Sequence, residues 1–259
     1  QSGMSMAVSL GLKQIAYKKL SDAEVSEKTW KLNAGHDADA EWSYLDATPA
    51  SCVKFGLNMH FCDKFPDVVV SGINHGSNAS SASCYSGTLG AAEEAALNGI
   101  PAIGVSLDSM NPDADFSAVK QFFPDIFRMI MDNLPENKGI YYNVNFPNIP
   151  AADIKGIRVG VQGKGRWVRE FRDWDPEIMK HLGITPESLG QHSYTGLEEG
   201  ETAYVMVGDY LDNPDNPETA DHLLMQKKYI SIVAHNLDTT DYDETKRISA
   251  LGFDKDFAK

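Results

Sequence analysis

The chain has 259 residues, of which 42% are hydrophobic and 23% are charged, and these proportions are ordinary for a globular protein. Its formal net charge of −14 argues against a nucleic-acid polymer as partner, because such partners usually require a basic face. No apolar run reaches the roughly 18 residues of a transmembrane helix, so we expect no transmembrane helix and no membrane partner. The expected location is the cytoplasm. The three cysteines, Cys52, Cys62 and Cys84, are scattered and indicate neither a disulfide framework nor a zinc site.

The N-terminal part of the chain gives weak signals followed by one clear helix start. Residues 1–15 indicate a loop and a short strand, and further strands are expected at Lys31–Leu32 and Trp42–Leu45. Thr48–Pro49 then favours the beginning of a helix, because threonine caps a helix and proline fits its first turn. We expect that helix to end at about Cys62.

A strand, a helix and a second strand follow one another before residue 108. The strands are predicted over 67–71 and 102–107, where apolar runs without polar alternation are typical of strands buried on both faces. Between them, residues 88–98 have the length of a helix and a face of small residues. This order predicts one βαβ unit of a parallel sheet. Ligands of open α/β sheets bind at the carboxyl ends of such strands.

The loop after the first of these strands carries groups that suit a hard cation and a phosphate. Asn74 offers a neutral oxygen ligand, and Gly72 and Gly76 let the backbone approach a ligand closely. His75 follows the candidate ligand and is a candidate to bind phosphate or to donate a proton to the leaving oxygen. The alternative is that Asn74 and the glycines only form a tight turn, with His75 as a structural residue of it.

The start of the predicted helix is a second candidate site. Ser86, Gly87 and Thr88 lie where the helix begins, and the free N–H groups of a helix start favour an anion. Either hydroxyl group can cap the helix. The alternative is that Ser86 only caps.

The second half of the chain changes in character at about residue 151. Before it we expect a helix over 116–133 and a strand over 141–147. After it we expect strand-like pieces at 156–161, 166–174, 191–197 and 202–210, which are joined by loops rich in Gly, Pro and Asp. A helix at 217–228 and a buried strand at 229–235 follow. The predicted fold is therefore α/β, with a Rossmann-like parallel-sheet core over 1–150 and a β-rich extension over 151–259 whose final helix and strand return to the core. Lys164 and Arg166 of the extension are candidates to clamp a phosphate, or simply belong to a solvated loop.

Several segments taken together strongly resemble the survival protein SurE family. The matching segments are Val70–Gly76 (Val-Ser-Gly-Ile-Asn-His-Gly), Tyr85–Thr88 (Tyr-Ser-Gly-Thr), Gly99–Leu107, Gln1-Ser2-Gly3, Ala47–Lys54, and Asp221 followed by Tyr229–Ile232. The resemblance is close over residues 1–110 and patchy beyond them.

The resemblance implies a Rossmann-like phosphatase that hydrolyses nucleoside monophosphates, a 5'/3'-nucleotidase, with short polyphosphate as a further substrate. It implies a divalent metal, Mg²⁺ or Mn²⁺, held by Ser2 and Asn74. It assigns catalysis to Asn74 and His75, and substrate or phosphate binding to Gly72, Gly76 and Ser86–Thr88. The small-molecule nucleotide is the expected partner, and a homodimer or homotetramer is expected because family members exchange C-terminal elements between subunits. An arm that folds back on its own core is the alternative.

One departure from the family pattern is large. The family begins with a strand and the motif Asn-Asp-Asp-Gly, whose two aspartates are the anionic metal ligands, and no Asn-Asp-Asp-Gly occurs in this chain. We therefore expect a core that lacks its first few dozen residues, its first strand and helix included, and that is a poor phosphatase by itself. The alternative of another class is a non-catalytic nucleotide- or phosphate-binding module that has lost its metal site.

Overall fold

The computed structural model describes residues 14–21, 23–25, 40–111, 113–175, 177, 198–206 and 208–254. It divides into two compact units. The first combines residues 1–162 with 218–259, and the second consists of residues 163–217. Two predicted strands, Lys31–Leu32 and 191–197, lie outside the described residues.

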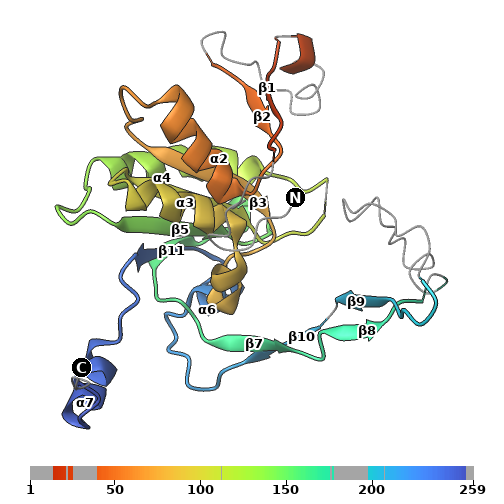
Figure 1. Ribbon diagram of the computed structural model, residues 1–259, viewed down its shortest axis with the longest axis vertical. Coiled ribbons are helices and arrows are strands. Elements are labelled where there is room, and N and C mark those ends of the chain that lie inside the picture. The colour runs from red at the N-terminus through yellow and green to blue at the C-terminus, as the bar shows by residue number, and fades with distance from the viewer. Residues whose placement is uncertain are drawn as a thin grey trace, which may run out of the picture. The chain divides into compact units, whose positions relative to one another are not determined.

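A five-stranded sheet forms the centre of the first unit, with the strand order β3-β4-β5-β11-β6 (Figure 1). The strands are β3 (Val69–His75), β4 (Ala102–Leu107), β5 (Ile140–Phe146), β11 (Tyr229–Asn236) and β6 (Gly156–Val159). The first three are parallel, β11 runs antiparallel to β5, and β6 is parallel to β11. This mixed, mostly parallel sheet flanked by helices confirms the predicted α/β Rossmann-like fold.

The α-helices of this unit are α2 (Pro49–Phe55), α3 (Gly87–Leu97), α4 (Ser117–Met131), α6 (Asp221–Gln226) and α7 (Tyr242–Ala250). The π-helix η2 (Gly56–His60) continues α2, and the 3₁₀-helix η3 (Ser80–Tyr85) precedes α3. A further 3₁₀-helix, η4 (Ala151–Asp153), follows β5. A short antiparallel pair, β1 (Tyr17–Lys19) and β2 (Ser43–Leu45), precedes these helices. The helix predicted from Thr48–Pro49 begins with Thr48 as its cap, and it ends at His60 rather than Cys62. The sequence pattern did not predict α7 or the short 3₁₀-helices η3 and η4.

The two faces of the sheet are chemically different. Residues at alternate positions of β4, β5 and β11 form one apolar cluster together with Val119 and Ile126 of α4; its strand members are Ile103, Val105, Leu107, Val144, Phe146 and Ile230. The opposite face contacts α3 through a small-residue cluster that includes Ala92, Ala95 and Ala96. Toward the carboxyl ends of β4 and β5 this second face carries fully buried polar residues, namely Ser106, Asn143 and Asn145, and the buried Ser231 of the antiparallel β11 lies opposite Asn145.

One expectation about the sheet is wrong. The strand predicted over 67–71 was expected to be buried on both faces, whereas Val70 is 44% exposed and Ile73 is 40% exposed. The reason is topological, since β3 is an edge strand of the described sheet and β4, its neighbour, is buried along its whole length. An apolar run does not reveal which strand lies at an edge.

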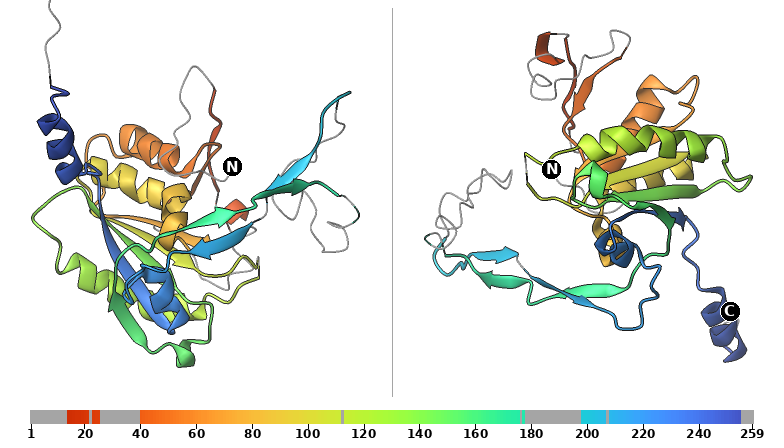
Figure 2. Two further views of the ribbon diagram at one scale, coloured as in Figure 1. Left: turned by 90° about the horizontal axis from the view of Figure 1, so that it is seen from below. Right: turned by 180° about the vertical axis from the view of Figure 1, so that it is seen from behind.

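The second unit consists of two antiparallel ribbons, which Figure 2 shows from two further sides. The strand β7 (Gly165–Val168) pairs with β10 (Asp209–Asp212), and β8 (Phe171–Asp173) pairs with β9 (Tyr204–Met206). Large apolar side chains of these ribbons stay exposed, among them Phe171 and Met206. In the described parts of the chain, no helix combines the length and the apolar character needed to cross a membrane.

Candidate functional site

The candidate site lies where β3 ends, and glycine geometry shapes it. Gly72 has φ +127°, and a Cβ atom at this position would come within 2.4 Å of the Val105 carbonyl oxygen of β4. The register between β3 and β4 shifts between Ser71 and Asn74 at this point. Gly76 also has a positive φ, +98°, and its N–H group donates to the Leu107 carbonyl oxygen. The two glycines therefore permit a backbone path close to β4 that a residue with a Cβ cannot follow without strain.

The amide of Asn74 is held in one orientation. Its Nδ2 atom donates to the Gly76 carbonyl oxygen at 2.7 Å and lies 3.4 Å from Asn78 Oδ1. Because a carbonyl oxygen accepts only, the nitrogen must face it and the Oδ1 atom must face away. Within the residues that the structure describes, this Oδ1 atom accepts no hydrogen bond. A fixed amide oxygen of this kind is a ligand that suits Mg²⁺ or Mn²⁺.

Three asparagines form a buried network beside Asn74, which we call the Asn78 bracket (Asn78, Asn143 and Asn145). The Asn78 backbone N–H donates to Asn145 Oδ1 at 2.8 Å, Asn145 Nδ2 donates to Asn143 Oδ1 at 2.8 Å, and Asn143 Nδ2 donates to the Asn78 carbonyl oxygen at 2.9 Å. The backbone groups of Asn78 thus fix the orientation of both amides. Asn78 Nδ2 also bonds Ser106 Oγ at 2.6 Å.

The sequence did not identify Asn78 as a site residue. It lies in a loop, outside any motif with a recognisable chemical role. Asn143 and Asn145 are two positions apart on β5 and therefore share one face, and this spacing is the sequence signal that could have indicated this edge of the sheet.

His75 leaves β3 on the face opposite to Asn74. In the register of β3 and β4, Asn74 is paired with Ser106 and His75 with Leu107, and successive residues of a strand point to opposite faces. The His75 Nδ1 atom donates to the Asn111 carbonyl oxygen at 3.0 Å, and its ring meets that of Phe116 edge-on at 5.0 Å. The exposed ring is therefore held by the loop after β4, with Nε2 as its free nitrogen.

The start of α3 is connected to this loop by η3. Ser86 is the helix cap, and its Oγ atom accepts a hydrogen bond from the Leu89 N–H at 3.0 Å. Gly87 and Thr88 follow as the first helical residues, whose backbone N–H groups lack helical acceptors. The helix lies close to β4, because a Cβ atom on Gly104 would come within 2.6 Å of Leu89. This arrangement can bind an anion.

Several titratable groups border the site or the sheet below it. Partial burial raises the pKa of Asp108, which directly follows β4. On β11, burial lowers the pKa of His235, whose ring stacks on Tyr141 with the centroids 5.2 Å apart. In the parts of the chain that the structure covers, no three His, Cys, Asp or Glu residues form a group that could hold a metal ion. Asn74 therefore fits a hard cation as one neutral ligand, and its expected partner Ser2 lies outside the described residues.

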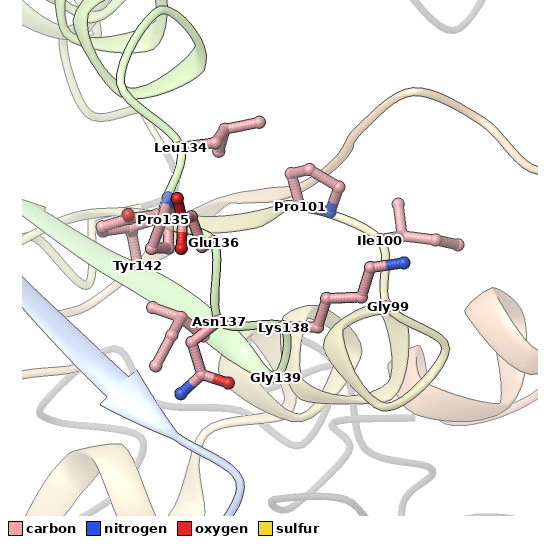
Figure 3. A pocket seen from close by; sticks show the side chains of 11 residues that line it. Gly99, Ile100, Pro101, Leu134, Pro135, Glu136, Asn137, Lys138, Gly139 and Tyr142 are labelled. Carbon is pink, nitrogen blue, oxygen red and sulfur yellow. The ribbon is translucent and has the colours of Figure 1, made fainter.

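Two other regions are described separately from this site. Lys164 and Arg166 lie in the second unit and both are exposed, and their role as a phosphate clamp stays a prediction. A hollow of about 190 Å³ lies at the amino ends of β4 and β5, where Pro101, Lys138 and Tyr142 line it (Figure 3). The hollow is separate from the loop of Asn74, because that loop lies at the opposite, carboxyl ends of the strands, where ligands of open α/β sheets bind.

Comparison with known proteins gives consistent results. The family described as survival protein SurE matches residues 1–169. A protein named 5'-nucleotidase SurE from Cytophaga hutchinsonii is 36% identical over 242 residues, which is 93% of this chain and 78% of that protein. A protein of the same name from Syntrophobacter fumaroxidans is 37% identical over 201 residues, which is 77% of this chain and 70% of that protein. The crystal structure of the SurE protein from Aquifex aeolicus matches with a TM-score of 0.67 and 25% identity, covering 97% of this chain and 84% of that one. The chain belongs to the survival protein SurE family.

Proposed function

We propose that this protein hydrolyses the phosphate monoester of nucleoside monophosphates, with a divalent cation, Mg²⁺ or Mn²⁺, as cofactor. The observation that carries the proposal is the amide of Asn74, fixed through its nitrogen so that its oxygen is free at the carboxyl end of β3. The relatives that share its family are named 5'-nucleotidases, which supports an enzyme over a non-catalytic binding module.

Each group of the site has a separate task in this proposal. When bound, the divalent cation supplies charge neutralisation at the phosphate and activation of a water molecule. Asn74, together with Ser2, provides neutral oxygen ligands to it. Gly72 and Gly76 leave room for the substrate beside the backbone. These tasks suit a dianionic monoester. The acidic chain as a whole repels its negative charge, and the bound cation would offset that repulsion at the site.

The start of α3 is proposed to hold the equatorial phosphate oxygens. The free backbone N–H groups of Gly87 and Thr88 are oriented by the helix and need no rearrangement during the reaction. Ser86 keeps this first turn in place through its bond to Leu89. His75 leaves β3 on the face opposite to Asn74, so we propose that it reaches the substrate over the end of the strand. It would do so through Nε2, because its Nδ1 atom is already bound to Asn111. This makes Nε2 the atom that donates a proton to the leaving oxygen or binds phosphate.

The proposal is tested by Asn74→Ala in the full-length protein. Phosphate release from nucleoside 5'- and 3'-monophosphates is measured while Mn²⁺ is titrated. We expect the Mn²⁺ concentration for half-maximal activity to rise at least about tenfold, the scale at which altered metal sites lose affinity. Asn58→Ala is the matched control. The Nδ2 atom of Asn58 also donates to a backbone carbonyl oxygen, that of Lys54, but Asn58 lies on η2 and not in the loop after β3. Absence of nucleotide hydrolysis at saturating Mn²⁺, or an unchanged Mn²⁺ dependence in Asn74→Ala, would contradict the proposal.

A further inference from the structure

A buried carboxylate from a distant part of the chain contacts the loop that follows the site. Asp221 is the first residue of α6 and is 0% exposed. Both of its carboxylate oxygens accept from the Ser80 backbone N–H, each at 3.0 Å, and Oδ1 also accepts from the His222 N–H at 2.8 Å. Residues 80 and 221 are 141 positions apart, so this contact joins the beginning of η3 to the segment that returns from the second unit.

The backbone that Asp221 contacts is strained. Ser80 has φ 55°, in the left-handed region that residues other than glycine rarely adopt. Such residues persist when the surrounding structure over-determines them. Ser80 is only 2% exposed, so water cannot satisfy its N–H group. A charged acceptor forms a hydrogen bond roughly twice as strong as a neutral one, and it therefore suits this position.

The strained residue is close in sequence to the groups that hold Asn74. Asn78 lies two positions before Ser80, and its backbone is fixed from the sheet side by Asn143 and Asn145. Its own Oδ1 atom faces the Asn74 amide at 3.4 Å. Segment 78–80 is thus held at one end by the Asn78 bracket and at the other by Asp221. Release of either end lets the segment relax and removes a constraint on Asn74.

We propose that Asp221 is a positioning residue of the site: through Ser80 it keeps segment 78–80 in the shape that orients the Asn74 amide. Asp221 touches neither substrate nor cation in this proposal. The competing interpretation is that the carboxylate only stabilises the fold at the start of α6. The activity part of the test rests on the proposed function, and the part that observes the loop does not.

The first measurement follows hydrogen exchange of the Ser80 backbone amide and of the Asn74 side-chain amide by NMR. In Asp221→Asn we expect both to exchange at least about tenfold faster than in the unchanged protein, because a neutral amide replaces the charged acceptor. Glu94→Gln is the matched control. Glu94 of α3 is likewise buried, at 2% exposure, and its carboxylate accepts a hydrogen bond from Lys54 of α2 at 2.7 Å. Unchanged exchange at Ser80 and Asn74 in Asp221→Asn would overturn the proposal even if the protein lacked activity.

The second measurement compares kinetics with nucleoside monophosphate and Mn²⁺. Misplacement of a catalytic group by about 1 Å costs on the order of 10²-fold in rate, so we expect a fall in kcat of that order in Asp221→Asn with a smaller change in KM. Glu94→Gln is expected to keep kcat. The double variant Asp221→Asn with Ser80→Gly is expected to regain at least about tenfold in kcat, because glycine adopts a positive φ without strain. A loss of kcat that Ser80→Gly does not restore, or an equal loss in Glu94→Gln, would show a purely structural role.

Discussion

Gly72 shows at the scale of one residue how closely the loop backbone approaches β4. We predict that Gly72→Ala destabilises the protein by at least about 1–3 kcal/mol, the usual cost of holding another residue in a conformation reserved for glycine. The new Cβ would also lie 2.4 Å from the Val105 carbonyl oxygen, a backbone atom. The measurement is urea-induced unfolding, monitored by circular dichroism.

Gly56→Ala is the control for this change. Gly56 lies in η2 with a helical φ of −55°, and a Cβ atom added there would have nothing within 4 Å. Alanine there should be neutral or stabilising by about 0.4–1 kcal/mol, since it restricts the unfolded chain. Equal free energies of unfolding for the two variants would mean that the path of the Gly72 backbone is not constrained as described.

The sequence indicates some residues of the candidate site but not the residues that contact them from distant parts of the chain. The position of Asn74 at the end of a strand was predictable, because its motif and the apolar run before it are both local features; its role as a ligand stays a prediction. The contacts of Asn78 and Asp221 were not predictable. They span 67 and 141 positions, from Asn145 to Asn78 and from Asp221 to Ser80. Local patterns carry no record of such partners.

The same limit applies to secondary-structure elements. The strand over 102–107 was predicted at its observed bounds, because a mainly apolar run without polar alternation is typical of a central strand and this strand has neighbours on both sides. The antiparallel direction of β11 against β5 was not predicted. An apolar run of that length is compatible with either strand direction. The direction of β11 depends on pairing with β5 and β6, which are distant in the sequence.

The N-terminus of α3 offers a prediction that separates stability from phosphate binding. Ser86→Ala should lower the free energy of unfolding by about 1 kcal/mol, because the Leu89 N–H loses its acceptor. Ser86→Asp should retain most of that stability, since aspartate is also a good helix cap. It should nevertheless raise KM for nucleoside monophosphates, because its charge repels the phosphate. Thermal unfolding and initial rates measure the two effects, and an unchanged KM in Ser86→Asp would argue against phosphate binding at this turn.

The sheet itself carries a pH-sensitive residue. Burial lowers the pKa of His235, so the unfolded chain binds a proton at this residue more readily than the folded protein does. The free energy of unfolding should therefore fall as pH decreases below the ordinary histidine value of about 6.5. His235→Phe keeps an aromatic ring against Tyr141 but cannot take up a proton.

Urea unfolding at about pH 7.5 and about pH 5.5, on either side of that ordinary value, measures this effect. We expect the unchanged protein to lose more stability between the two pH values than His235→Phe does. Equal losses would show that protonation of His235 does not contribute to acid destabilisation.

For the whole molecule, the open question is what covers the ribbons of residues 163–217. Two-stranded ribbons are marginally stable by themselves. Their exposed apolar side chains include Trp167, Phe171, Tyr204 and Met206, which are 43%, 65%, 60% and 67% exposed. Large apolar side chains that stay exposed are typical of interaction sites when they form a patch, and exchange of an identical element between subunits is a low-cost route to a dimer. We therefore predict a homo-oligomer, a dimer or a tetramer, assembled through these ribbons.

Light scattering of the 259-residue protein at micromolar concentration tests this prediction, with Met206→Asp and Met129→Asp as a matched pair. Both methionines are strongly exposed, Met206 on β9 at 67% and Met129 on α4 at 63%. A charge at Met206 should dissociate the oligomer, because it must be desolvated in the interface, whereas a charge at Met129 should leave the mass unchanged. One chain of 259 residues has a mass of 28.4 kDa. A single-chain mass for the unchanged protein, or equal dissociation by both variants, would place the apolar side chains of the ribbons outside any subunit interface.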